Sequence, residues 1–190
     1  LTSRVEALAV WDPDGAGPLE PRAFAGGRFA WSGVFDTRGI AQWTGHQWEP
    51  VDAGVTVGGG SAEVSSLVPW PAHAASGAAP KLIVGGSFTL AGTTPASRIA
   101  AWDGSTFHAL GLGLPNEPHA ITTWDPDGEG PLAHLVVANY GTTIRVWDGA
   151  AWTTLPKPTT SGSGYALAAF DLDGSGPEPN SLIVAVLSLG

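Results

Sequence analysis

The feature that most constrains this chain is a pattern that recurs after 59 residues. Gly-Gly-x-Phe occurs at 26–29 and again at 85–88, and Ile-Ala-x-Trp occurs at 40–43 and again at 99–102. Two further aromatic pairs keep the same spacing: Trp11 with Trp70, and Trp48 with Phe107. Repeats of this length are built from one small unit that buries its apolar face only by stacking on its neighbours. The chain is therefore expected to be an array of such units.

Two further copies follow, each with a change. In the third copy Ala138-Asn139 takes the place of the glycine pair, and the second hairpin loop before 144–147 is expected to be eight residues shorter. The fourth copy begins at Tyr165–Phe170 and continues through Leu182–Val184. It reaches Gly190 before its third strand could start, so it is expected to supply half a unit.

Each complete copy predicts four strands, which the first copy places at Val5–Trp11, Arg22–Gly26, Gly39–Trp43 and Gln47–Val51. Pro/Asp/Gly-rich segments connect the first two strands, and tight turns connect the last two. Asp-Gly between two apolar runs is a strong hairpin signal. The first two strands are apolar almost throughout, as expected when both faces of a sheet are covered. Repeated four-stranded antiparallel sheets of this kind are typical of the blades of a β-propeller.

The predicted fold is therefore all-β: a single propeller-type domain or fragment of about three and a half four-stranded antiparallel blades. The predicted boundaries are about 5–60 for blade 1, 61–116 for blade 2, 117–164 for blade 3 and 165–190 for the half blade. Propellers usually have four to eight blades. The ring is expected to be completed either by the rest of a longer protein or by self-association, with the exposed strand edge of the last blade as an adhesive surface.

Composition excludes several classes of partner. The formal net charge is -9, with eight Lys and Arg residues, so no basic patch for nucleic acid or an anionic membrane surface is expected. No apolar run reaches the roughly 18 residues that a membrane-spanning helix needs, so membrane insertion is not expected. The chain has no Cys and therefore no disulfide framework. It also has no Met, which suggests a mature form or a piece of a longer protein.

The repeat resembles known families. A strand, a Gly-Gly pair, then a Trp and a second aromatic residue resemble the kelch repeat, and this likeness covers nearly the whole chain. The fuller pattern is best seen in 61–112, with LIVGGSFTLAG followed by SRIAAWDG. It is similar to the blades of large bacterial secreted or surface proteins and to the repeat of fungal cortical-marker proteins. The resemblance implies a propeller in an extracellular or cell-surface location, and it carries no catalytic signature.

Three acidic turns are candidate calcium sites, because carboxylates that alternate across a glycine turn suit a hard cation. Their carboxylates are Asp12, Asp14, Asp125, Asp127, Asp171 and Asp173. None of the turns has the late bidentate Glu of an EF-hand loop, so the favoured interpretation is an Asx-type turn in which Asp accepts backbone N–H groups. No cofactor is expected, and calcium is the alternative.

Ligand binding is expected at the opposite end of the blades, where propellers usually bind their ligands. The longer loops lie there, at 30–38, 54–62, 90–98, 111–118 and 156–164. The weak candidates for contact with a glycan or protein ligand are Trp31, Phe35, Arg38, Arg98 and His119. The repeat-locked tryptophans are predicted to be core: Trp11, Trp43, Trp48, Trp70, Trp102, Trp124, Trp147 and Trp152.

No catalytic group stands out. The five histidines, at 46, 73, 108, 119 and 134, lack the short spacings of a zinc site, and no nucleophile elbow, phosphate loop or dinucleotide fingerprint occurs. The function expected from the sequence is a non-enzymatic binding or scaffold module. Two alternatives remain open: a hydrolase or lyase that acts on polysaccharide through the loop face, and a calcium-stabilised structural array.

Overall fold

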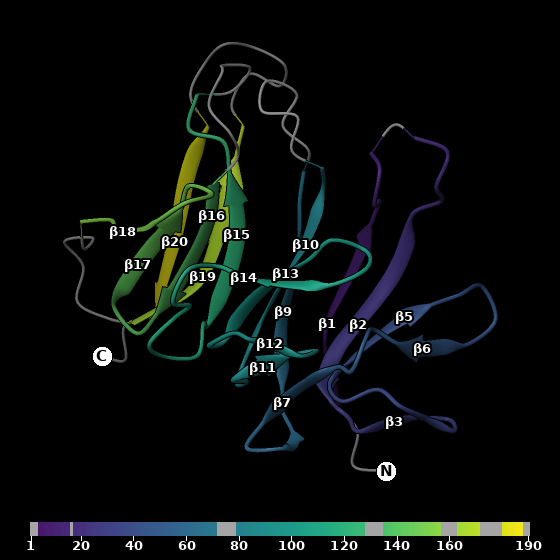
Figure 1. Ribbon diagram of the computed structural model, residues 1–190. Helices are drawn as coiled ribbons and strands as arrows, with labels where there is room; N and C mark the ends of the chain where they lie inside the picture. Colours follow the sequence, from purple (N-terminus) through teal and green to yellow (C-terminus); the bar gives the residue numbers. More distant parts are fainter. Residues whose placement is uncertain are drawn as a thin grey trace. The chain divides into compact units, whose positions relative to one another are not determined.

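The computed structural model describes residues 4–15, 17–71, 79–127, 135–156, 163–171 and 180–187. These residues form strands, turns and loops and contain no helix, which confirms the predicted all-β class (Figure 1). The chain divides into two compact units, and each is described by itself. Unit 1 comprises Leu1–Ala72 and Ala79–Glu117, and unit 2 comprises His73–Ala78 and Pro118–Gly190.

Unit 1 contains two four-stranded antiparallel sheets, which we call blades 1 and 2. Blade 1 has the strand order β1 (Arg4–Trp11), β2 (Arg22–Arg28), β5 (Ile40–Trp43) and β6 (Trp48–Pro50). Blade 2 has β9 (Val64–Trp70), β10 (Lys81–Gly86), β13 (Ile99–Trp102) and β14 (Phe107–Ala109) in the same order. The four strands predicted for each copy are confirmed. Gly45 and Gly104 adopt positive φ in the tight turns before β6 and β14, as such turns require.

Unit 2 contains the third sheet and a two-stranded one. Blade 3 has the order β15 (Ala120–Trp124), β16 (Leu135–Tyr140), β17 (Thr143–Trp147) and β18 (Trp152–Thr154). The half blade is a single antiparallel hairpin of β19 (Ser163–Phe170) and β20 (Ser181–Leu187). The half blade thus has the first two strands of the repeat, as predicted.

Short strands replace part of what the sequence predicted as loops. Strands β7 (Val55–Val57) and β8 (Gly60–Ser61) pair with β11 (Leu90–Ala91) and β12 (Thr94–Pro95) in a small sheet of order β12-β11-β7-β8. In blade 1 the corresponding loop is a lone hairpin of β3 (Trp31–Ser32) and β4 (Phe35–Asp36). Strands of two or three residues show no alternation that a sequence pattern could reveal.

The first hairpin of each blade has a common register. Leu8 lies opposite Ala25 in blade 1, and Leu67 lies opposite Val84 in blade 2, with a bulge at the start of each first strand. In blade 3 Asn139 lies opposite Ile144, just as Gly26 lies opposite Ile40.

That register corrects the predicted alignment of the third copy. Asn139 and Tyr140 occupy the glycine-pair positions, one residue later than predicted from Ala138-Asn139. Ile144 is five positions after Asn139, whereas Ile40 is fourteen positions after Gly26, so the loop is shorter by nine residues and not eight. The prediction was wrong because it aligned Ala138-Asn139 with the glycine pairs of the earlier copies, whereas the strand pairing aligns Asn139 with Gly26.

The second residue of each glycine pair lies so close to backbone atoms of the neighbouring strand that only glycine fits there. A Cβ on Gly27 would collide with the carbonyl oxygen of Arg4, and a Cβ on Gly86 with that of Glu63. The Ser87 N–H donates to the same Glu63 carbonyl at 3.0 Å. Glycine therefore lets the second strand approach the start of the first, which holds the bulge in place.

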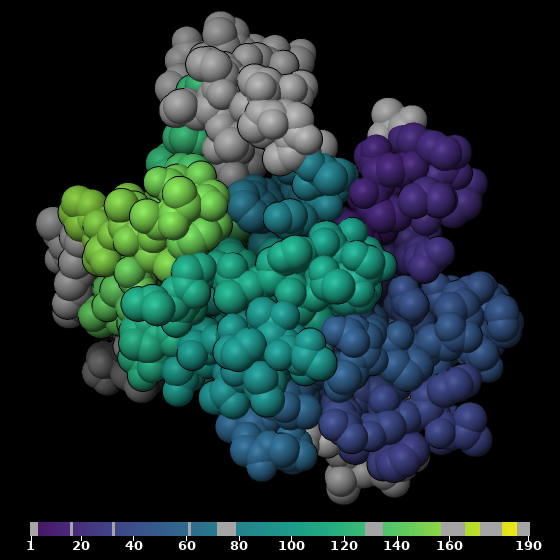
Figure 2. Space-filling model, viewed as in Figure 1, coloured from purple at the N-terminus to yellow at the C-terminus, as the bar shows by residue number. Residues whose placement is uncertain are grey.

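Blade 1 packs face to face on blade 2, and their side chains lie directly beside one another in Figure 2. Trp11 and Phe24 of blade 1 share one buried cluster with Val64, Leu67 and Val84 of blade 2. We call the face that a blade turns to the blade after it the trailing face, and the opposite face the leading face. Blade 3 packs on the half blade in the same sense.

The predicted tryptophan core is confirmed in part. Trp11, Trp102 and Trp147 are buried, and the other described members of the set are half-buried except Trp43. Trp43 is 37% exposed, so its assignment to the core was wrong. Its indole lies on the leading face of blade 1, which no other sheet covers in the described structure.

Gly86→Ala is expected to lower the free energy of unfolding by about 1–3 kcal/mol, because the added methyl group would meet the Glu63 carbonyl. Gly60→Ala is the matched control, since its Cβ would have only one neighbour, 3.7 Å away. The control is expected to change stability by less than about 0.5 kcal/mol. Urea unfolding measures both, and equal losses would contradict the role given to the glycine pair.

Candidate functional site

The candidate ligand residues of blade 1 lie on or near the β3–β4 hairpin. Trp31 lies in β3 and Phe35 in β4. Arg38 has a positive φ of 42°, and its Nε donates to Asp36 Oδ2 at 2.8 Å. Its carbonyl accepts the Val55 N–H at 2.8 Å, so Arg38 connects the hairpin to β7.

Arg98 anchors the corresponding loop of blade 2. It has a φ of 64°, its carbonyl accepts the Gly86 N–H at 3.1 Å, and its Nη1 donates to the Leu114 carbonyl at 3.1 Å. The equivalent bond in blade 1 runs from Gly27 to the Gly39 carbonyl, so Arg98 corresponds to Gly39 and not to Arg38. Both arginines therefore make structural hydrogen bonds within their loops.

The five predicted ligand residues do not form one site within a single unit. His119 belongs to unit 2, where it is exposed and its backbone N–H donates to the Asn139 carbonyl at 2.8 Å. The other four belong to unit 1. Among them, Trp31 lines an apolar groove on the leading face of blade 1.

The acidic turns use their carboxylates to bind backbone. Asp12 Oδ1 accepts the Asp14 N–H at 3.2 Å and the Gly15 N–H at 3.0 Å, and Asp14 Oδ2 accepts the Leu19 N–H at 3.0 Å. Asp125 Oδ1 accepts the Asp127 N–H at 3.3 Å. Asp171 directly follows β19, and Asp173 lies outside the described residues. These bonds favour the Asx-turn interpretation. Among the described residues, no group of three or more His, Asp or Glu side chains could hold a metal ion.

A carboxyl pair links the starts of β1 and β9. Arg28 Nε donates to Glu63 Oε2 at 2.5 Å, and Arg4 Nε donates to Glu6 Oε1 at 2.6 Å. A hydrogen bond between the two carboxyl groups lowers the pKa of Glu6 and raises that of Glu63, which burial raises further. No sequence pattern indicates this pair, because the two residues are far apart in the chain and only the packing of blade 1 on blade 2 brings them together.

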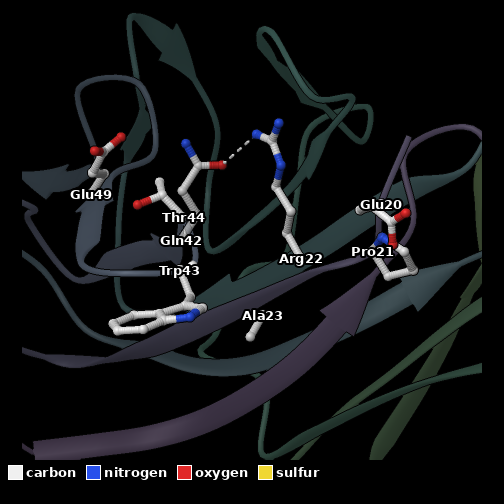
Figure 3. A pocket seen from close by; sticks show the side chains of 9 residues that line it. Glu20, Pro21, Arg22, Ala23, Gln42, Trp43, Thr44 and Glu49 are labelled. Carbon is white, nitrogen blue, oxygen red and sulfur yellow. Dashed lines mark hydrogen bonds between the residues drawn. The ribbon is translucent and has the colours of Figure 1, made fainter. Parts of the chain in front are cut away.

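A polar hollow of about 480 Å³ lies at the turn end of blade 1 (Figure 3). On one side Arg22 Nη1 donates to Gln42 Oε1 at 3.5 Å, and on the other the Trp43 indole lies near Ala23. Glu20 and Glu49 also line it. The sequence placed the best binding surface at the opposite, loop end of the blades.

An apolar groove of about 380 Å³ lies on the leading face of the same blade. Its walls are Val5, Leu8, Ala25, Phe29, Trp31, Ala41 and Trp48. Apolar area of this kind favours contact with another apolar surface. None of the described segments forms a long apolar helix of the kind that crosses a bilayer.

A chelator is expected to leave the melting temperature unchanged, because Asp12 Oδ1 and Asp14 Oδ2 already accept backbone N–H groups in the first acidic turn. Thermal unfolding followed by circular dichroism, with and without EDTA, measures this. A melting temperature that falls with EDTA and recovers with added calcium would instead support the calcium-stabilised array.

Asp103→Asn is expected to destabilise the protein in a pH-dependent way. Burial opposes ionisation of Asp103, but hydrogen bonds from His108, Thr106 and Ser105 outweigh it and hold its pKa well below the usual range. Because the folded-state pKa is depressed, the stabilisation is complete above the ordinary Asp pKa of about 4 and is lost as the pH falls below it. The substitution should cost about 1 kcal/mol at pH 7 and less at pH 3.

Asp148→Asn is the control for that measurement, since Asp148 accepts the Ala151 and Ala150 N–H groups in the equivalent turn and its pKa is lowered chiefly by them. Thr153 stands there in place of His108, so a smaller loss is expected. Urea unfolding at the two pH values compares the variants. An Asp103→Asn loss that is as large at pH 3 as at pH 7 would contradict the assignment.

No protein-family model, curated protein or solved structure matched the chain. The likeness to kelch repeats and to cortical-marker repeats therefore stays a prediction from the sequence.

Proposed function

We propose that this chain is a non-enzymatic scaffold module of the β-propeller type that binds a further blade through the leading face of blade 1. The observation that carries the proposal is a contrast between equivalent residues, meaning residues at the same register position in different blades. On the leading face, residues of blade 1 are exposed, whereas the equivalent residues of blade 2 are buried against blade 1.

Two aliphatic positions show the contrast. Val5 is 54% exposed and its equivalent Val64 is 0% exposed; Leu8 is 70% exposed and its equivalent Leu67 is 8% exposed. The side chains are of the same type and the strands pair in the same register. The difference is that blade 1 covers the leading face of blade 2, whereas no other described sheet of unit 1 covers that of blade 1.

The same difference in exposure is found where the leading face ends at the tight turns. Trp43 is 37% exposed, and its equivalent Trp102 is 5% exposed. A Cβ on Gly104 would lie 3.4 Å from the Trp11 ring of blade 1, whereas a Cβ on Gly45 would have no neighbour within 4 Å. The place beside Trp43 and Gly45 therefore corresponds to the one that Trp11 occupies against blade 2, and both residues also line the polar hollow of Figure 3.

The partner that fits such a face is a twisted sheet with small residues along its first strand and an aromatic residue at the end of that strand. Ala7 and Ala9 pack against the shared core in the existing joint, and Trp11 follows them in the same strand. Apart from the two indole N–H groups, the side chains that line the apolar groove offer no hydrogen-bond partner for sugar hydroxyls, so we favour a protein partner over a saccharide. With the resemblance to bacterial surface proteins, we place this scaffold outside the cell, secreted or on the cell surface.

The polysaccharide-active alternative gains no support from the carboxyl pair. Glycoside hydrolysis uses two carboxyl groups about 5 Å or more apart, with the sugar between them. Glu6 and Glu63 share a hydrogen bond and are bound by Arg4 and Arg28. Such a pair stabilises the contact between β1 and β9, and a substrate would have to break it.

A photo-crosslinking residue in place of Leu8 tests the proposed function in cells that make the protein. The expected product is an adduct with a peptide from a first-strand hairpin of the repeat type, in this or another polypeptide. The control places the same residue at Val57, which is exposed on β7 outside the leading face. Absence of an adduct at position 8, or adducts that do not differ from those at position 57, would contradict the proposal.

A further inference from the structure

The geometry points to a second copy of this chain as the partner, docked head to tail, with the half blade of one copy on the leading face of blade 1 of the next. This inference rests on the proposed function and adds the identity of the partner. It follows from comparing the two apolar faces that the described structure leaves exposed.

The half blade has the same register as the first hairpin of blade 1. Trp11 lies opposite Arg22 and Phe170 opposite Ser181; Ala9 lies opposite Phe24 and Ala168 opposite Ile183. The bulge also falls at the same position, between Val5 and Ala7 in one hairpin and between Gly164 and Ala166 in the other. Every position of β19 and β20 therefore has an equivalent in β1 and β2, 159 residues earlier.

The trailing face of the half blade has the residue types that the joint needs. Ala166 and Ala168 are equivalent to Ala7 and Ala9, which pack on blade 2. Ile183 and Phe170 are equivalent to Phe24 and Trp11, so an apolar residue and an aromatic residue are kept at those positions. In the half blade, however, Phe170 is 51% and Ile183 is 49% exposed.

The same joint occurs a second time in the described structure. In unit 2, Val137 and Ile144 on the trailing face of blade 3 pack with Leu167 and Val184 on the leading face of the half blade. Leu167 is equivalent to Leu8 and to Leu67. The joint therefore forms with two different sets of side chains in this one chain, and the exposed leading face of blade 1 matches the exposed trailing face of the half blade.

The leading face of blade 1 has a place for Phe170, the largest side chain of the half blade's trailing face. Phe170 is equivalent to Trp11, whose ring lies near Gly104 in the blade 1 to blade 2 joint. On the leading face of blade 1 that place is next to Gly45 and Trp43, which also line the polar hollow (Figure 3). Ala168 and Ile183 would pack in the apolar groove around Leu8.

One position fits less well. Ala185 is equivalent to Gly26, and a Cβ on Gly26 would lie 2.5 Å from Val64 Cγ1. In the docked pair Ala185 would meet Val5, whose side chain must move aside. Blade 3 already has a larger residue at this position, the buried Asn139. The contact between copies is therefore expected to be weaker than the joint within unit 1 and to depend on concentration.

A head-to-tail contact joins two different faces, so each copy has one face left to bind the next. Such contacts close into a ring if the rotation allows it and otherwise extend into a filament.

Light scattering on the 190-residue chain and four samples made from its variants tests the inference. The wild-type chain of 19.3 kDa should have at least twice that mass at high concentration. Leu8→Glu, which spoils the leading face, and Ile183→Glu, which spoils the trailing face, should each weaken association about tenfold or more, because a carboxylate would be buried without a partner. Val57→Glu, outside both faces, should assemble like the wild type. Near-ultraviolet circular dichroism checks that each variant is folded.

The mixture of Leu8→Glu with Ile183→Glu is the decisive sample. Each variant keeps the face that the other has lost, so the mixture should form a complex of one copy of each, which stops at twice 19.3 kDa. A wild-type chain that stays monomeric, or a mixture that does not associate, would overturn the inference. If Leu8→Glu alone prevents assembly and Ile183→Glu does not, blade 1 binds by its leading face to a partner other than the half blade. In that case the inference fails and the proposed function stands.

Discussion

The packing of one blade's trailing face on the next blade's leading face is the interaction on which the described structure depends. In unit 1, Val64, Leu67 and Val84 share a core with Trp11 and Phe24, and none of these side chains could be buried within its own sheet. A four-stranded sheet with two apolar faces is not stable alone in water, since burial of apolar area supplies most of the stability. The second joint, between blade 3 and the half blade, shows that the contact is a property of the repeat and not of one pair of sheets.

In unit 1 the glycine pair makes this contact possible. Gly27 and Gly86 let the second strand pass close under the carbonyl at the start of the first, where any side chain would collide. Gly26 in turn leaves room for Val64 of the following blade. The glycine pair of the repeat is therefore explained by backbone contact within a blade and side-chain contact between blades. The arginines at positive φ, Arg38 and Arg98, connect the loops at the other end in a similar structural way.

Much of the fold could be predicted from the sequence, because the 59-residue spacing and the Asp-Gly turns are local signals of strands and hairpins. The rest depends on neighbours that a sequence does not place. The pairing of β7 with β11 joins strands of two or three residues, too short to show a period. The exposure of Trp43 and the contact of Glu6 with Glu63 are decided by which blade lies beside which. The candidate ligand residues were chosen by loop position, and that criterion does not distinguish a ligand contact from a loop anchor such as Arg98.

A crystal structure of the assembled protein would show what covers Val5 and Leu8. We expect Ala168 and Ile183 of a neighbouring copy to cover them, as Ala9 and Phe24 share one core with Leu67 in unit 1, with Phe170 beside Trp43. A structure in which this face is bare, or is covered by a surface other than β19 and β20, would contradict this expectation.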